Sequence, residues 1–370
     1  MAGFGDVLLI LVGIVAVVIV LDAAIRTFVV PRGTVVLFTV VVFRVTRRFF
    51  SFFASPRRGY EARDRVMAVY APIALLALPF TSMIVVFAAF TCIFSGLEQH
   101  GWRSALTISG SSLLTLGFDR PPDLPSAFAA FTEAIIGLSI LALLIAYLPT
   151  IYNSFSKREI AVTDLAIRAG TPPNPAAMLI RAHLTGYLDD LDRFWESWTA
   201  WFTEVQETHT SYGSLAFFRS PNPHRSWVTA AGAVLDTAAV RLALLEISWT
   251  PAAPLCIRSG YLALREVAGF FGFDYDDSPA ADDAISVTRD EFDELCVTLT
   301  EAGVPIRADH DQAWRDFVGW RVNYDRVLIT LAAYVMAPYA PWVSDRSPVE
   351  PLVHYGWGKR RIEISRRAQR

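Results

Sequence analysis

Cysteine is scarce in this chain of 370 residues, and the few cysteines present do not cluster. Cys92, Cys256 and Cys296 lie far apart in the sequence and form no CxxC pair. Because no two of them share a ligand-like spacing, neither a disulfide framework nor a zinc site is expected.

Histidine and the motifs of common enzymes are lacking too. The six histidines form no HExxH or HxxxH pair, and no GxGxxG follows a strand-like segment. We therefore expect no enzyme, no organic cofactor and no bound metal. The acidic run from Asp274 to Asp283 has Pro279 where an EF-hand loop requires glycine, which favours a solvated loop over a divalent-cation sensor.

A large excess of one charge is the third absence. The chain carries 33 basic and 36 acidic residues, a net charge of −3, so a nucleic-acid partner is not indicated. Apolar residues dominate instead: they make up 53% of the chain, while only 19% of its residues are charged. That balance predicts a membrane part followed by a soluble part.

Three stretches are long enough to span a membrane, because each offers the ~20 apolar residues that a span needs. They run roughly over Val7–Val30, Met67–Phe94 and Ser126–Tyr147. No basic residue precedes the first stretch, and no small-residue cleavage site follows it. We therefore expect a retained membrane helix there and not a signal peptide.

A basic and aromatic segment separates the first two stretches. Its apolar part, Val35–Phe43, is about half the length of a span and is followed by Arg44, Arg47 and Arg48 and by four phenylalanines. This pattern favours a helix lying in the membrane interface. The alternative is a further span whose arginines snorkel to the surface.

The arginines also predict the orientation. Eight of them fall between residues 31 and 66, whereas the residues before the first span contain no lysine or arginine. Basic loops stay on the cytoplasmic side. We expect a multi-pass protein of the cell membrane with its N-terminus outside and its large C-terminal domain in the cytoplasm.

A short apolar and polar segment, Ser104–Leu114, lies between the second and third spans and leads into Thr115-Leu116-Gly117-Phe118-Asp119. Non-helical backbone at membrane depth persists only where protein or a water-filled cavity covers it, so this order is typical of a re-entrant pore loop. Residues 105–118 match without a gap the pore helix and the T-x-G-Y/F-G-D filter of potassium channels. Over about residues 60–155 the chain resembles the bacterial two-transmembrane, tetrameric potassium-channel family.

The resemblance implies a fold, a partner and an ion. It implies a homotetramer that K⁺ or another monovalent cation permeates, with Thr115, Leu116, Gly117, Phe118 and Asp119 as the ion filter. We expect an all-α membrane protein: residues 1–32 a transmembrane helix, 33–62 the basic interfacial segment, 63–156 the pore module and 157–370 a helical cytoplasmic domain.

The filter departs from the family pattern in two places. Asp119 stands where the family has its second glycine, and Arg120 stands where the family has aspartate. An alternative alignment deletes that glycine, equates Asp119 with the family aspartate and shortens the filter by one residue. Leu114 replaces a threonine, and Ser111 replaces an acid that often braces the filter. An altered filter is therefore expected.

Two residues of the third span invite a functional interpretation. Glu133 is the only acid in that span, and an ionisable residue inside a membrane helix is a functional candidate. We expect it to brace the filter through Arg120, Ser111 or Ser112; the alternative is a neutral glutamic acid hydrogen-bonded between helices. Gly137 is either a hinge or a site of close helix packing.

The C-terminal half shows a helical period almost throughout, which predicts a compact all-α domain. Trp195, Trp198 and Phe202 share one helical face and predict a packing stripe. Thr288 and Glu291 form a capping box. The basic residues from Lys359 to Arg367 are expected to be a disordered end or a contact with anionic lipid or a neighbouring subunit.

Two functions follow as hypotheses. The first is a cation channel that the helical domain gates or assembles. The alternative is a non-conducting membrane scaffold or sensor that keeps the pore fold but has lost its filter. Copies of the chain itself and membrane lipid are the expected partners.

Overall fold

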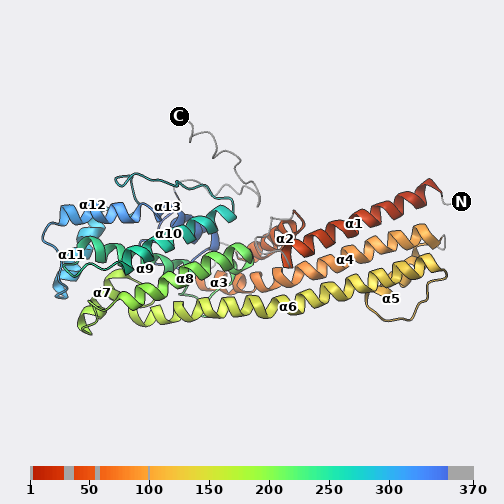
Figure 1. The fold of residues 1–370 in the computed structure, drawn as a ribbon, viewed down its shortest axis with the longest axis horizontal. Coiled ribbons are helices and arrows are strands. Elements are labelled where there is room, and N and C mark those ends of the chain that lie inside the picture. Colours follow the sequence, from red (N-terminus) through yellow and green to blue (C-terminus); the bar gives the residue numbers. More distant parts are fainter. Residues whose placement is uncertain (1–2, 29–36, 55–58, 99–100, 349–370) are drawn as a thin grey trace, which may run out of the picture. The chain divides into compact units, whose positions relative to one another are not determined.

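The computed structural model describes residues 3–28, 37–54, 59–98 and 101–348. Within these ranges the chain is helical and contains no strand, so the predicted all-α class is confirmed (Figure 1). The basic tail from Lys359 to Arg367 and the end of the first predicted span at Val30 lie outside the described residues.

The chain divides into two compact units. The first comprises residues 1–55 and 69–152, and the second comprises residues 56–68 and 153–370. Helix α6, Leu124–Ala169, contributes to both as one helix of 46 residues with Pro149 inside it. The predicted domain limits at residues 32, 62 and 156 stay predictions.

The helix α6 continues well past Tyr147, where the predicted third span ends. The apolar run ends there, but a buried stripe at helical spacing continues, and it keeps the chain helical. The stripe comprises Tyr147, Ile151, Arg158, Val162, Leu165 and Ala169. Hydropathy alone therefore did not locate the end of the helix, and the end of the span at Tyr147 stays a prediction.

Four helical stretches among the described residues are long and apolar enough to cross a membrane, as expected of a membrane protein: Phe4–Thr27, Tyr60–Leu97, Leu124–Ala169 and Trp227–Leu244. The fourth differs from the others because 94% of it is buried inside the protein. It is helix α9, enclosed in the second unit by α7, α10, α12 and α13. We interpret it as the core helix of that unit.

Glycines allow the first unit's long helices to pack closely. Helix α1, Phe4–Phe28, lies alongside α4, Tyr70–Glu98 (Figure 1). A methyl group at Gly13 would lie 2.6 Å from the Ala89 carbonyl oxygen, and one at Gly96 would lie 2.6 Å from the Asp6 carbonyl oxygen. Small residues that let backbones approach are typical of membrane helix pairs.

Helix α2, Leu37–Phe53, packs on α4, and its buried residues include Val40 and Phe43. The Tyr70 hydroxyl donates to the Phe43 carbonyl oxygen at 3.4 Å. At 17 residues α2 is not one of the four apolar stretches above. The interfacial position predicted for it stays a prediction.

The second unit packs helices around α9, Trp227–Leu244. The predicted stripe of Trp195, Trp198 and Phe202 is buried on α8, which packs against α10. The predicted capping box of Thr288 and Glu291 opens α11. The other elements are α3 Tyr60–Ala68, α7 Pro175–Leu184, α8 Asp192–Ser211, η1 Gly213–Phe217, α10 Ala252–Phe270, α11 Arg289–Glu301, α12 His310–Arg321 and α13 Asp325–Val335.

A buried charge cluster fixes α13 against its neighbours. The Arg321 guanidinium binds the carboxylates of Asp236 and Asp325, and the Tyr324 hydroxyl donates to Asp236 at 2.9 Å. Arg321 and Asp236 are fully buried. Because a buried charge without its partner is costly, this cluster holds α9, α12 and α13 in one arrangement.

Candidate functional site

The predicted pore helix is α5, Trp102–Leu113, in the first unit. One side of it is apolar and buried: Ala105, Ile108 and Leu113 join the core that α4 forms with α1. Helix α6 supplies Ala130, Ile136 and Ile140 to the same core. Helix α5 is therefore held from several sides.

The loop after α5 turns its amides back onto the helix that it leaves. The Leu116 and Gly117 amides donate to the Ser111 carbonyl oxygen at 2.8 and 3.4 Å, and the Thr115 amide donates to Ser112 at 3.0 Å. The Asp119 amide donates to the Ser111 hydroxyl at 3.1 Å. Ser111 thus holds the loop with both its backbone and its side chain.

These hydrogen bonds from the backbone amides fix the direction of the loop carbonyls. In a trans peptide the C=O bond points opposite to the N–H bond of the next residue. Since the amides of Leu116, Gly117 and Asp119 face α5, the carbonyls of Thr115, Leu116 and Phe118 point away from it. Several oxygens of one short segment are therefore presented on the side away from the protein core.

The backbone of the loop supports the same arrangement. Thr115 and Gly117 have φ of +53° and +70°, whereas the intervening Leu116 and the following Phe118 are not left-handed. A left-handed threonine is strained by about 1–2 kcal/mol. The amide hydrogen bonds to Ser111 and Ser112 hold Thr115 in this conformation. Backbone strain of this kind is typical of functional sites.

Asp119 is bound to the pore helix. Its carboxylate accepts a hydrogen bond from the Thr107 hydroxyl at 2.6 Å. It is not among the described residues with positive φ. The carboxylate therefore lies on the α5 side of the loop, opposite to the carbonyls.

Glu133 reaches the pore helix through a serine that we had not expected. Its Oε1 lies 2.5 Å from the Ser109 hydroxyl, which also lies 3.1 Å from the Phe87 carbonyl oxygen. The expected partners Ser111 and Ser112 do not make this contact. Residues two apart on a helix face nearly opposite sides, so the Ser111 hydroxyl faces the loop while Ser109 faces α6. Glu133 joins α4, α5 and α6.

Arg120, the third expected partner of Glu133, is exposed and forms no ion pair with any described residue. Gly137 lies against the end of α5 instead. A methyl group there would lie 2.8 Å from the Leu113 carbonyl oxygen and 2.9 Å from Leu113 Cδ1. The close approach makes packing one role of this glycine; a hinge stays a prediction.

In the second unit, the buried Arg158 and the largely buried Arg219 meet at one short segment, residues 213–220. Arg158 of α6 donates to the carbonyl oxygens of Leu215 and Phe218 at 2.8 and 2.7 Å and pairs with Glu159 at 2.8 Å. Its own carbonyl oxygen accepts from the Trp201 ring at 3.3 Å. The C-terminal part of α6 is thereby fixed to η1 and α8.

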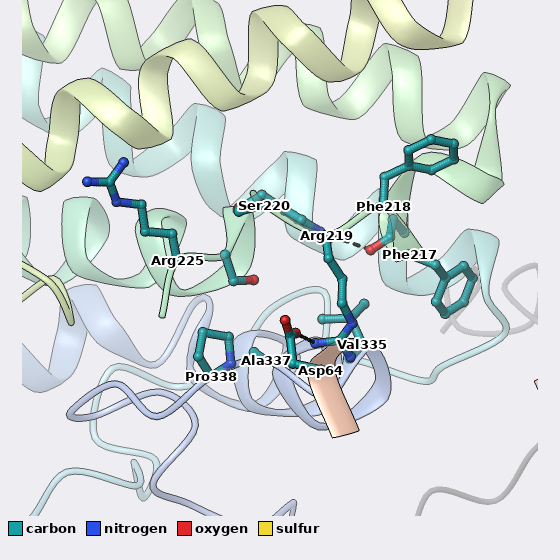
Figure 2. A pocket seen from close by; sticks show the side chains of 12 residues that line it. Asp64, Phe217, Phe218, Arg219, Ser220, Arg225, Val335, Ala337 and Pro338 are labelled. Carbon is teal, nitrogen blue, oxygen red and sulfur yellow. Dashed lines mark hydrogen bonds and ion pairs between the residues drawn. The ribbon is translucent and has the colours of Figure 1, made fainter. Parts of the chain in front are cut away.

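Arg219 fixes α3 to the same segment. Its guanidinium pairs with Asp64 of α3 (Figure 2). It also donates to the carbonyl oxygens of Val335 and Met336 at 2.9 and 3.2 Å. A cation at a helix C-terminus satisfies the last carbonyls and the helix dipole. Arg225 points away from this pair. Arg219 thus joins α3, the segment 213–220 and the end of α13.

A small cavity of about 20 Å³ lies beside this ion pair. The Ser220 hydroxyl, which is buried and has no hydrogen-bond partner among the described residues, is one of its polar groups. That volume is enough for a single water molecule. The cavity is too small for an organic ligand.

His209 lies beside Arg158 and is buried. Its Nε2 is 3.2 Å from Arg158 Nη1 and must accept, because a guanidinium offers only donors. Burial and the neighbouring charge of Arg158 hold the pKa of His209 well below its ordinary value of 6.5. The imidazole is therefore neutral at pH 7.

We expect His209 to make the protein less stable in mild acid. Its pKa is lowered in the folded state, so below pH 6.5 the unfolded chain binds a proton that the folded chain does not. Stability then falls by up to about 1.4 kcal/mol per pH unit. Thermal unfolding followed by tryptophan fluorescence between pH 7.5 and 5 measures this, since nine of the ten tryptophans lie after residue 190. His209→Gln should flatten the dependence; a slope equal to that of wild type would contradict the assignment.

The described residues contain no group of three or more histidine, cysteine or acidic side chains able to hold a metal ion. Comparison of the chain with protein-family models, with curated proteins and with solved structures found no match. A functional proposal therefore rests on the geometry of the loop after α5 and of the segment 213–220.

Proposed function

We propose that the chain is one subunit of a homotetrameric, cation-permeable membrane channel whose ion path is lined by residues 115–118. The observation that carries the proposal is the direction of the loop carbonyls. Thr115, Leu116 and Phe118 present oxygens away from the pore helix, on a segment between two membrane-length helices. Rings of backbone carbonyls are how potassium channels replace the hydration shell of an ion.

Assembly follows from the same loop. One loop cannot enclose a pore, and in a single chain Leu116 and Phe118 are 60% and 66% exposed. Non-helical backbone at membrane depth must be shielded from lipid by protein or by a water-filled cavity. Neighbouring copies would provide this shielding, and the resemblance to potassium channels implies four.

The electric field at the carboxyl end of the pore helix would favour a cation over an anion in the loop. The carboxyl end of α5 leads directly into the loop, and a helix carries about half a negative charge at that end. The Asp119 carboxylate lies behind the loop on Thr107 and adds to this negative field. Its contact with the pore helix favours the shorter alignment, in which Asp119 follows a four-residue filter, Thr115–Phe118.

The helical unit would hold both pore helices. Through Asp64 and Arg219 it holds α3, which ends two residues before α4 begins, and through Arg158 it holds the extension of α6. Segment 213–220 is common to both attachments. A movement of this segment would thus act on the outer and the inner helix together, as a gating or assembly domain requires.

Flux into liposomes tests the proposal. Purified protein in liposomes should dissipate a K⁺ gradient, and a parallel Na⁺ gradient measures selectivity, with protein-free liposomes as the control. No flux of either ion would contradict a channel and leave the non-conducting scaffold or sensor. That alternative is favoured by the Asp119 replacement in the filter and by Leu114 just before it.

A further inference from the structure

An open groove of about 480 Å³ lies between helices α1 and α2, and the proposed ion path does not use it. Its walls are apolar and exposed: Val18 and Ile19 come from α1, and Leu37 and Val41 come from α2. Asp22 lines one end and is paired with Arg26 at 2.7 Å. An exposed apolar groove on a membrane helix needs an apolar occupant.

Two arginines of α2, Arg44 and Arg48, follow the groove residues along the same helix. Leu37, Val41, Arg44 and Arg48 recur at spacings of four, three and four residues, so they form one stripe along α2. Arg48 stands about 10 Å along the helix from Val41. Both arginines are exposed and form no ion pair with any described residue. One face thus presents an apolar groove first and two guanidinium groups next.

This order matches the order of groups in a lipid. An acyl chain is apolar, and the phosphate of its headgroup lies about one helical turn or more away from it. Guanidinium groups bind phosphate oxygens in a bidentate manner. Arginines near a membrane surface also attract anionic lipids. Residue 22 lies near the carboxyl end of α1, beside the basic segment, so groove and arginines belong to the same leaflet.

We propose that the groove between α1 and α2 is a binding site for an anionic phospholipid of the leaflet that faces the basic segment. An acyl chain lies along Val18, Ile19, Leu37 and Val41, and the headgroup phosphate is bound by Arg44 and Arg48. The lipid fixes α2, and through the α2–α4 contact it supports the start of the outer helix.

Native mass spectrometry of the purified full chain, with phosphatidylglycerol or phosphatidylcholine added in detergent, tests the site. Wild type should retain phosphatidylglycerol more tightly than phosphatidylcholine. Arg44→Gln with Arg48→Gln should weaken retention of phosphatidylglycerol by about 25-fold, or about 5-fold per arginine. Arg103→Gln, at an exposed arginine on α5, should leave it unchanged.

A second pair of variants tests the groove itself. Val41→Trp fills it and should reduce retention of both lipids, whereas Val15→Trp, on an exposed part of α1 outside the groove, should not. Equal retention by wild type and by the double arginine variant would overturn the proposal. So would a Val41→Trp variant that loses its oligomeric state and keeps its lipid, because the occupant would then be a second copy. Lipid retention is measured without ion flux, so its failure is distinct from failure of the channel.

Discussion

Gly137→Ala should displace the pore helix and abolish ion flux. In an ordinary helix this change stabilises by about 0.5–1 kcal/mol, because glycine is the weaker helix former. Here the new methyl group would lie 2.8 Å from the Leu113 carbonyl oxygen, which is backbone and cannot rotate away. Overpacking of this kind costs about 1–3 kcal/mol. Leu113 immediately precedes the loop, so its shift moves the carbonyls that the ion would meet.

Gly110 offers a matched control on α5. A methyl group there would lie 3.5 Å from Phe87 Cε2, an ordinary contact, so Gly110→Ala should keep flux and raise stability slightly. Thermal unfolding by circular dichroism and K⁺ flux in liposomes separate the two variants. If Gly137 acts only as a hinge, Gly137→Ala would instead be at least as stable as wild type with altered opening, and the packing role would be wrong.

Arg219→Met should detach α3 from the helical unit. The change leaves the Asp64 carboxylate, whose side chain is 9% exposed, without its cation and leaves two helix-end carbonyls without a donor. Removing one partner of a buried ion pair costs about 3–5 kcal/mol. For a unit of this size the midpoint of thermal unfolding should fall by about 10 °C.

Arg225→Met is the control, because Arg225 lines the same cavity but its side chain makes only one hydrogen bond to a described residue, at 3.3 Å to Thr163. It should cost less than about 1 kcal/mol. A double-mutant cycle with Asp64→Asn completes the test: the double variant should be more stable than the sum of the single changes predicts. Additive effects would show that Arg219 and Asp64 are not coupled, and the proposed attachment of α3 would fail.

The sequence was most informative where one local pattern decides the outcome. Hydropathy located α1, α4 and α6, and the order of apolar and polar residues located α5. The capping residues Thr288 and Glu291 opened α11 as predicted. These features depend on residues close together in the chain, which periodicity records directly.

Contacts between distant residues were not predictable in the same way. Ser109, and not Ser111, meets Glu133, because the rotation of α5 about its axis decides which serine faces α6. Asp64 of α3 binds Arg219, which lies 155 residues away in the sequence. Burial of charge depends on packing, and no local pattern signals it.

The position of Thr115 on the ion path is the central claim. The most direct test is whether a reagent that binds the thiol of Thr115→Cys blocks ion flux. Silver ions bind thiolates strongly because both are soft. Added to liposomes during K⁺ flux, they should stop flux through Thr115→Cys and spare both wild type, with its three native cysteines, and Ser51→Cys on α2. Unchanged flux through fully labelled Thr115→Cys would contradict the account, as would the absence of flux in every variant and in wild type.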